Sequence, residues 1–168
     1  MLEKQAKIVY LGIGSNLGNR FSNIEKAKSK IFEKNILILK SSSYYETLSW
    51  PNNRNPKFFN IILKVKTKYD EFELLNICKD IEKHLGRKKK PKNSPRECDI
   101  DIIDYNNIVT NNTIELPHPR MHNRNFVLFP LFELNKNWKH PISKNHIKKL
   151  IISLPNRDIR SIKQIWIN

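Results

Sequence analysis

An α+β fold with one antiparallel sheet is predicted from three observations on the 168-residue sequence. Apolar runs rich in β-branched residues, which are typical of strands, alternate with two segments of helical periodicity. The segments with a clear strand or helix pattern follow one another in the order β-α-β-β-α-β, and apolar segments with a weaker pattern come after them. The length of 168 residues allows one sizeable core and is short for two, so we expect a single domain over residues 1–168.

The first half of the chain is predicted to supply three strands and one helix. KIVYLGIGS, residues 7–15, is an apolar run containing glycines and predicts a buried strand. Residues 18–35 predict a helix with Ser22 as its N-cap. Its apolar positions at helical spacing are Ile24, Ala27, Ile31 and Phe32. Two more strands are predicted over 36–45 and 58–67, with a loop rich in Pro and Asn between them.

The second half of the core is predicted to add a helix over 70–86, with acidic residues in its first turn and Gly86 at its end. Its apolar stripe consists of Leu74, Ile77, Ile81 and Leu85. A strand within PRECDIDIIDY, residues 95–105, completes the order. This order is the ferredoxin-like arrangement, with both helices on one face of the sheet. A C-terminal extension is predicted to hold a hairpin and two short apolar helices, over 106–117, 125–134 and 146–154.

Charge favours an anionic partner. Lys and Arg outnumber Asp and Glu by 31 to 16, which gives a formal net charge of +15 at pH 7. Nucleic acid, a membrane surface and a phosphorylated small molecule all fit such an excess, whereas lysines spread evenly over the surface would need no partner. Local clusters of charge therefore carry more information than the sum.

Cysteine content and hydropathy indicate the compartment. Cys78 and Cys98 form no C-x-x-C pair, so neither a zinc site nor a disulfide framework is expected. No apolar run approaches the ~20 residues of a membrane-spanning helix. The N-terminal segment fits a first strand better than a signal peptide. We therefore expect a cytoplasmic protein without a membrane partner.

Two carboxylates stand two residues apart in the last core strand. Because side chains on a strand alternate between its faces, Asp99 and Asp101 should point to the same side, roughly 6 to 7 Å apart. Like charges at this spacing repel unless they are well solvated or a cation lies between them. An isolated D-x-D also fits a solvated strand face, so the residues around the pair decide between a solvated face and a cation site.

A strongly basic segment directly precedes this strand. GRKKKPKNSPR, residues 86–96, holds two arginines and four lysines and no acidic residue. By itself the segment is compatible with a solvated loop. Beside a pair of carboxylates it suggests phosphoryl transfer, because carboxylates that hold Mg²⁺ and cations that bind phosphate oxygens recur in such sites. Arg87 and Arg96 are suited to bidentate phosphate binding.

Two weaker motifs accompany these. GIGSNLG, residues 12–18, matches neither the dinucleotide fingerprint nor a Walker A sequence, but its glycines allow a sharp turn and a close approach of a ligand to the backbone. LPHPRMHNRNF, residues 116–126, places His118 between two prolines that stiffen it.

Taken together, five segments resemble the 6-hydroxymethyl-7,8-dihydropterin pyrophosphokinase family. They are LGIGSNLG, FFN, LGR, PRECDIDI and PHPRMHNRNFVLFPLFEL, in the family's order and at nearly its spacings from about residue 7 to about residue 135. The resemblance implies an enzyme of folate biosynthesis. In its reaction the pterin hydroxymethyl oxygen attacks the β-phosphorus of ATP, the pyrophosphoryl group is transferred, and AMP leaves.

The resemblance also implies roles for individual residues. Asp99 and Asp101 would bind two Mg²⁺ ions that bridge the phosphates of ATP, and Arg87 and Arg96 would act with them in catalysis. The positions that match ATP contacts are Glu82, Arg87, Lys89, Arg96, Ile102, His118 and Arg124. The positions that match the pterin pocket are Thr47, Leu48, Trp50, Phe58, Asn60 and Phe126. Aromatic rings and an amide also suit a flat, polar heterocycle.

The basic segment departs from the family pattern. Members usually carry a Trp-Gly pair before P-R and a second arginine, whereas this chain has KNSPR and Lys89. Because residues 86–96 lack an apolar anchor, we expect them to act as a mobile lid that closes over ATP mainly through charge. Small-molecule substrates and a monomeric state are expected.

The strongest alternative is a nucleic-acid-binding module, since a ferredoxin-like sheet and a high positive charge also describe an RNA-recognition domain. Such a domain needs an aromatic RNP1 pattern on its third strand, and KFFNIILKV lacks it. We therefore expect no nucleic-acid partner.

Overall fold

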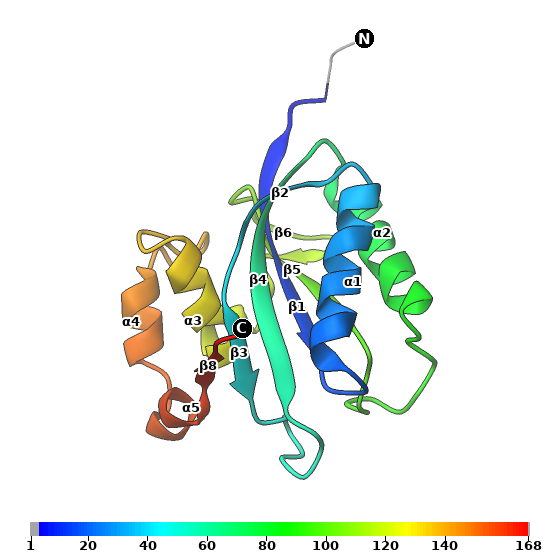
Figure 1. Cartoon of the computed structure of the whole chain (residues 1–168). Coiled ribbons are helices and arrows are strands. Elements are labelled where there is room, and N and C mark those ends of the chain that lie inside the picture. Colours follow the sequence, from blue (N-terminus) through cyan, green and yellow to red (C-terminus); the bar gives the residue numbers. More distant parts are fainter. Residues whose placement is uncertain (1–3, 168) are drawn as a thin grey trace.

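A computed structural model describes residues 4–167 (Figure 1). Its main sheet has six strands in the order β5-β1-β4-β3-β8, with β2 also paired to β4. The strands are β1 (Lys7–Ser15), β2 (Leu37–Ser41), β3 (Tyr44–Thr47), β4 (Phe58–Thr67), β5 (Asp99–Tyr105) and β8 (Lys163–Ile165). The helices are α1 (Arg20–Glu33), α2 (Glu71–His84), α3 (Asn125–Leu134), α4 (Ile147–Ile152) and α5 (Asn156–Ser161). The predicted ferredoxin-like order is confirmed, because β1 lies at the centre of the core sheet, between β5 and β4.

The centre of the sheet agrees closely with the sequence. β1 and β4 have the predicted bounds, and they pair antiparallel along their whole length, from Lys7 opposite Thr67 to Ser15 opposite Phe59. β1 also pairs antiparallel with β5. Long apolar runs with β-branched residues form such strands because both of their faces are buried.

The prediction for the first helix is corrected in two details. Its N-cap is Asn19, whose side-chain oxygen accepts a hydrogen bond of 2.9 Å from the Ser22 N–H, so Ser22 lies inside the helix. Ile31 is buried, but its neighbour Phe32 is 67% exposed, because consecutive helical residues point about 100° apart.

The second helix begins with a capping box. The Asp70 side chain accepts from the backbone N–H groups of Phe72 and Glu73, and the Glu73 carboxylate accepts from the Asp70 N–H at 2.8 Å. Gly86 follows the helix with φ of 104°, a conformation that favours glycine. The buried face of the helix is wider than the predicted stripe, so that Glu82 is buried at its C-terminal end.

The strand predicted over 36–45 is two strands. β2 ends at Ser41, and β3 begins at Tyr44. Between them the Ser42 hydroxyl accepts a 2.9 Å hydrogen bond from the Ile62 N–H, and the Ser42 N–H donates to the Ile62 carbonyl at 2.9 Å. Serine side chains compete with regular backbone pairing in this way, and the three consecutive serines therefore interrupt the strand.

Each face of the sheet carries its own apolar core. The core helices α1 and α2 cover one face, as predicted, over a cluster that includes Leu11, Leu63 and Ile100. The C-terminal helices α3 and α4 cover part of the other face, over a cluster that includes Ile62 and Ile103. The C-terminal extension is therefore part of the fold's second core.

The extension contains the elements that were predicted and three that were not, a short 3-10 helix over Met121–Asn123, the helix α5 and the strand β8. A small hairpin, β6 (Thr110–Asn111) and β7 (Glu115–Leu116), and the helix α3 lie where they were expected. The last apolar helix, α4, is shorter than its predicted range. The unpredicted strand β8 extends the sheet beside β3. Within the described residues, no helix is long and apolar enough to cross a membrane.

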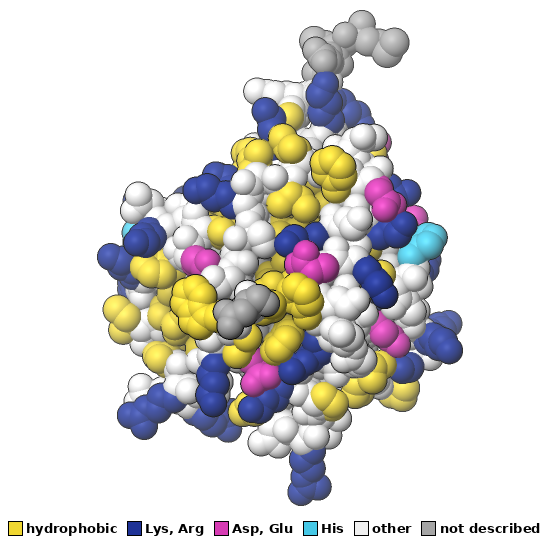
Figure 2. Space-filling view, viewed as in Figure 1, with side chains coloured by type: hydrophobic (Ala, Val, Ile, Leu, Met, Phe, Trp, Pro, Cys, Tyr) yellow, Lys and Arg dark blue, Asp and Glu magenta, His cyan; other side chains and the backbone are white. Residues whose placement is uncertain are grey.

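The nucleic-acid-binding alternative conflicts with this architecture. An RNA-recognition domain binds RNA on the open face of its sheet, whereas here α3 and α4 pack on that face. Figure 2 shows Lys and Arg side chains spread around the visible surface without one dominant patch.

Candidate active site

A cavity of about 770 Å³ opens beside the C-terminal ends of β1 and β3 and the N-terminal ends of β4 and β5. The loop between β3 and β4, the basic segment and residues 118–127 form its walls, and α5 contributes on the far side. One group of lining residues, which we call the charged half, comprises Arg87, Arg96, Asp99, Asp101, His118 and Arg124. A second group, the aromatic half, comprises Thr47, Leu48, Trp50, Phe58, Asn60 and Phe126.

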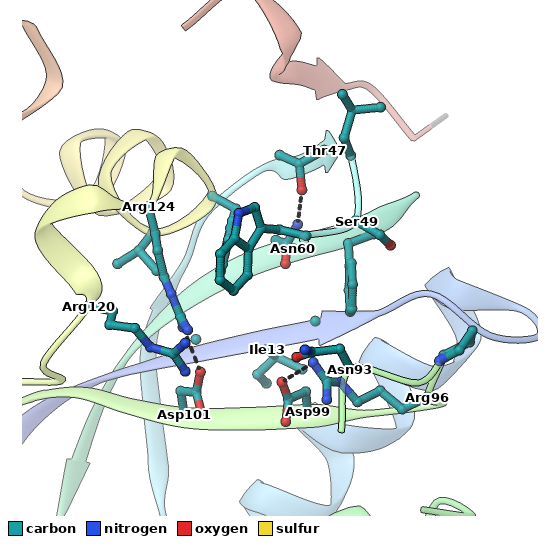
Figure 3. Close-up of a pocket in the computed structure, with 18 of the residues that line it drawn as sticks. Ile13, Thr47, Ser49, Asn60, Asn93, Arg96, Asp99, Asp101, Arg120 and Arg124 are labelled. Atoms are coloured by element: carbon teal, nitrogen blue, oxygen red, sulfur yellow. Dashed lines mark hydrogen bonds and ion pairs between the residues drawn. The ribbon is translucent and has the colours of Figure 1, made fainter. Parts of the chain in front are cut away.

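The register of β5 directs both aspartates into the cavity. Asp99 lies opposite Gly14 of β1, and Asp101 lies opposite Gly12. Ile100 and Ile102 alternate with them and are buried in the core under the helices. The predicted same-side placement of the two carboxylates is therefore confirmed, and Figure 3 shows them side by side at the floor of the pocket.

Gly14 is required where the strand approaches two side chains of the aromatic half. A Cβ at this position would lie 2.9 Å from Asn60 Oδ1 and 3.3 Å from Phe58 Cδ1. Any larger residue would push these side chains out of place.

Asp99 is held by two arginines. Arg87 Nη1 lies 2.8 Å from Asp99 Oδ1, and Arg96 Nη2 lies 3.3 Å from Asp99 Oδ2. Arg87 Nη1 also lies 2.6 Å from Oε2 of Glu82. Burial alone would lower the pKa of Arg87, but the carboxylates of Asp99 and Glu82 outweigh it and raise that pKa. Arg87 is therefore a permanent cation at this end of the cavity.

Glu82 is a buried partner of both Arg87 and β5. Its side chain is only 1% exposed, and its Oε1 accepts a 2.7 Å hydrogen bond from the Ile100 N–H. Burial raises the pKa of its carboxyl, although the hydrogen bond and the nearby cations Lys79 and Arg87 act in the opposite direction. Glu82 thus joins the end of α2 to the start of β5 and fixes Arg87 between them.

Asp101 has neighbours of its own, the cation Arg124 and the imidazole ring of His118. Arg124 Nη1 lies 3.4 Å from Asp101 Oδ2, and His118 Nε2 lies 3.7 Å from the same oxygen. Burial lowers the pKa of His118, and the attraction of Asp101 is opposed by the charges of Arg124 and Arg120. His118 Nδ1 accepts a 3.2 Å hydrogen bond from the Arg120 N–H, so the neutral ring carries its proton on Nε2, toward Asp101.

One arginine atom in the charged half has no partner. Arg96 Nε is buried, and among the described residues it is the one buried side-chain nitrogen or oxygen atom without a hydrogen bond. Unsatisfied buried donors are costly, and a bound anion would satisfy this one.

The aromatic half is built on paired strands. Asn60 on β4 donates a 3.0 Å hydrogen bond from Nδ2 to Thr47 Oγ1 on β3, and both side chains are buried. Figure 3 shows this pair across the cavity from the aspartates. Arginines meet the rings at the boundary between the halves: Arg96 Cζ lies 5.7 Å from the Phe58 ring centroid, and Arg124 Cζ lies 5.3 Å from that of Phe126.

Three residues matched to ATP contacts do not line the cavity. Ile102 packs into the core under α1 and α2, because it alternates with the aspartates. Glu82 lies behind Arg87. Lys89 is exposed, and its neighbours Lys88 and Lys90 line the cavity instead.

Other lining residues were missed by the sequence reasoning. Arg120 and Lys79 add positive charge to the cavity, and the C-terminal residues Arg157, Asp158 and Ser161 form part of its wall. Asn125 Nδ2 holds this last segment through a 2.8 Å hydrogen bond to the Asp158 carbonyl. Nothing in the local sequence around 157–161 indicated a site, since only the tertiary fold brings it there.

The arrangement suits binding of a phosphorylated ligand together with a hard metal ion. Among the described residues no group of three or more His, Cys, Asp or Glu side chains could hold a metal. Two carboxylates with oxygen donors nevertheless fit Mg²⁺, which commonly takes one or two protein carboxylates and completes its coordination with substrate phosphates and water. The arginines around them are suited to the phosphate oxygens.

Relatives of this chain have names that agree with such a site. The chain is 41% identical over 142 residues to the 2-amino-4-hydroxy-6-hydroxymethyldihydropteridine pyrophosphokinase of Aquifex aeolicus, and the match covers 84% of this chain and 88% of that protein. The Bacillus subtilis protein of the same name is 38% identical over 130 residues, or 76% of this chain and 77% of that protein.

Solved structures and the family model extend the comparison. The crystal structure of wild-type Plasmodium falciparum HPPK-DHPS matches with a TM-score of 0.78 at 17% identity, over 99% of this chain and 45% of that one, so it shows the fold alone. This chain spans about half the length of such solved chains. The model of the 7,8-dihydro-6-hydroxymethylpterin-pyrophosphokinase (HPPK) family matches residues 10–136. The chain therefore belongs to the 7,8-dihydro-6-hydroxymethylpterin-pyrophosphokinase family.

Proposed function

We propose that this cavity binds ATP in its charged half and 6-hydroxymethyl-7,8-dihydropterin in its aromatic half. The enzyme transfers pyrophosphate from ATP to the pterin hydroxymethyl group in folate biosynthesis and releases AMP. The observation that carries the assignment is the pair Asp99 and Asp101 on one side of β5, surrounded by arginines and facing a cavity with aromatic and amide side chains.

Asp99 and Asp101 are the proposed ligands of two Mg²⁺ ions. When bound, such ions neutralise phosphate charge and stabilise the oxygens of the transferred group. The aspartates are paired with Arg87, Arg96 and Arg124 in the structure. We propose that binding exchanges these partners: the carboxylates turn to the metal, and the guanidinium groups turn to the phosphates.

Positioning and electrostatics supply most of the catalysis in this proposal. The buried Glu82 keeps Arg87 near the phosphates. The Nε2–H of neutral His118 donates toward the same region, and Arg96 Nε gains a partner when an anion binds. The family resemblance also assigns ATP contacts to Lys89 and Ile102. Neither residue lines the cavity, so any contact that they make with ATP comes from outside this lining.

The aromatic half is proposed to hold the pterin. Phe58 and Phe126 supply rings for stacking, Asn60 and Thr47 supply polar groups for the edge of the heterocycle, and Leu48 and Trp50 border the opening. Leu48 is 39% exposed and Trp50 is 67% exposed. These two side chains therefore have room to move over a bound ligand.

We further propose that the chain is a cytoplasmic monomer that forms one domain. Both cysteines are buried and free, which fits a reducing compartment. Light scattering of the purified protein would test the monomeric state, and a mass of two chains would contradict it.

The direct test of function is product analysis. Purified protein with Mg²⁺, ATP and 6-hydroxymethyl-7,8-dihydropterin should give AMP and the pterin diphosphate. Formation of ADP, or the absence of pterin-dependent turnover, would overturn the proposal.

A further inference from the structure

Asn16 lies directly after β1 and joins two walls of the cavity. Its Oδ1 accepts a 2.9 Å hydrogen bond from the Arg96 N–H, and its own N–H donates to the Arg96 carbonyl at 3.1 Å. Its Nδ2 donates to Ser49 Oγ at 3.2 Å and to the Pro56 carbonyl at 3.1 Å. Because Arg96 N–H can only donate, this network also fixes the orientation of the Asn16 amide.

The two walls that Asn16 joins belong to different halves of the cavity. Arg96 is part of the charged half and lies 3.3 Å from Asp99. Ser49 and Pro56 belong to the loop between β3 and β4, which carries Leu48 and Trp50 of the aromatic half. Asn16 is 2% exposed and does not itself line the cavity.

We propose that Asn16 is a positioning residue that couples the two halves, so that a nucleotide bound at Arg96 strengthens pterin binding beside the loop between β3 and β4. The inference rests on the proposed function. A shift of the Arg96 backbone must move Asn16 or break its hydrogen bonds, and a shift of Asn16 must move Ser49 and Pro56. Either ligand therefore displaces the Asn16 amide or holds it in place. The coupling is reciprocal, because each ligand changes the affinity for the other by the same factor.

The residue types at this junction fit the role. An amide has two donor hydrogens and an acceptor oxygen, and Asn16 uses both kinds of group on different segments. An aspartate has the same shape and keeps the acceptor for Arg96, but it cannot donate to Pro56. Asn16→Asp should therefore disconnect the loop between β3 and β4 while the link to Arg96 remains.

The experiment measures pterin affinity by calorimetry with and without a non-hydrolysable ATP analogue and Mg²⁺. The quantity compared is the ratio of pterin affinity with the analogue to pterin affinity without it. In the wild type we expect this ratio to be on the order of fivefold or more. In Asn16→Asp this ratio should fall to below about twofold. Ser49→Ala, which removes one partner of the amide without placing a new charge in the interior, should lower the ratio in the same direction.

Asn23→Asp is the matched control. Asn23 lies near the same turn, and its Nδ2 donates to Ser15 Oγ at 3.2 Å and to the Leu17 carbonyl at 2.8 Å, so it touches neither wall. It should keep the wild-type ratio. An unchanged ratio in both Asn16→Asp and Ser49→Ala, or an equal loss in Asn23→Asp, would overturn the coupling role. Failure of the wild type to bind either ligand would instead overturn the proposed function.

Discussion

The charged half and the aromatic half of the cavity differ in how their side chains are held. Asp99 and Asp101 are bound by arginines through ion pairs of 2.8 to 3.4 Å, and these partners are Arg87 and Arg96 of the basic segment and Arg124. Asn60 and Thr47 are instead joined across two paired strands and buried. The charged half is thus assembled from exchangeable ion pairs, whereas the aromatic half is largely preformed.

This difference has a physical cause. Partly exposed ion pairs are weak because water competes for both ions, so a polyanion with its metal can replace them. A buried amide paired across a sheet has no such competitor, and moving it would leave a polar group unsatisfied. Substitutions in the charged half should therefore affect rate, and those in the aromatic half should affect pterin affinity.

The largest expected effect is on the aspartates. Asp99→Asn or Asp101→Asn should each lower the rate on the order of a hundredfold, which corresponds to about 2.7 kcal/mol of transition-state stabilisation, because the metal loses a charged ligand. Steady-state assays at fixed Mg²⁺ would measure the loss, and circular dichroism would verify the fold. The control is Asp80→Asn, at an exposed helical position near Lys83. A fully active Asp101→Asn enzyme would contradict the metal assignment.

A smaller effect is expected at Gly14. The Cβ of Gly14→Ala would displace Asn60 and Phe58, so pterin should bind roughly tenfold more weakly, about 1.4 kcal/mol. Binding of the nucleotide alone should change little, because the contacts at Gly14 are with the aromatic half. Separate titrations with each ligand would check this, and an equal loss for both would show that the two halves are not separable.

Trypsin cleavage of the basic segment tests whether this segment closes over the charged half mainly through charge. Trypsin should cut between Lys88 and Lys92 severalfold more slowly when a non-hydrolysable ATP analogue, Mg²⁺ and pterin are bound. High salt should reduce this protection, since it screens exposed charges. Equal cleavage of free and liganded protein would indicate a loop that remains solvated throughout.

The smallest effect concerns pH and His118. Burial lowers the pKa of His118 below 6.5, so the unfolded chain takes up its proton first as the pH falls. The free energy of unfolding should therefore decrease from pH 6.5 downward, toward the lowered pKa of the folded state. Urea denaturation at pH ~7.5 and pH ~5.5 should show a smaller decrease for His118→Gln than for the wild type.

His140 provides the comparison for this measurement. It lies outside the cavity lining, its pKa is also lowered by burial, and its Nδ1 accepts hydrogen bonds from the backbone N–H groups of Ile142 and Ser143. His140→Gln should reduce the same pH dependence without changing ATP binding. A pH dependence that neither substitution alters would mean that other groups control it.

The sequence by itself determined the order of the core elements and the side of β5 on which the aspartates lie. Both follow from local periodicity: apolar runs formed β1 and β4, and alternation along a strand placed Asp99 beside Asp101. Most of the residues to which family resemblance assigned a role do line the cavity, because matched motifs carry tertiary information that periodicity does not.

Only the tertiary structure decided the break at Ser42 and the second core under α3 and α4. It also brought Arg120 and the segment 157–161 to the cavity and placed Asn16 between two of its walls. The physical reason is that hydrogen bonds and packing between distant segments set these features. Asn16 contacts residues 33, 40 and 80 positions away along the chain, and no local pattern could show those partners.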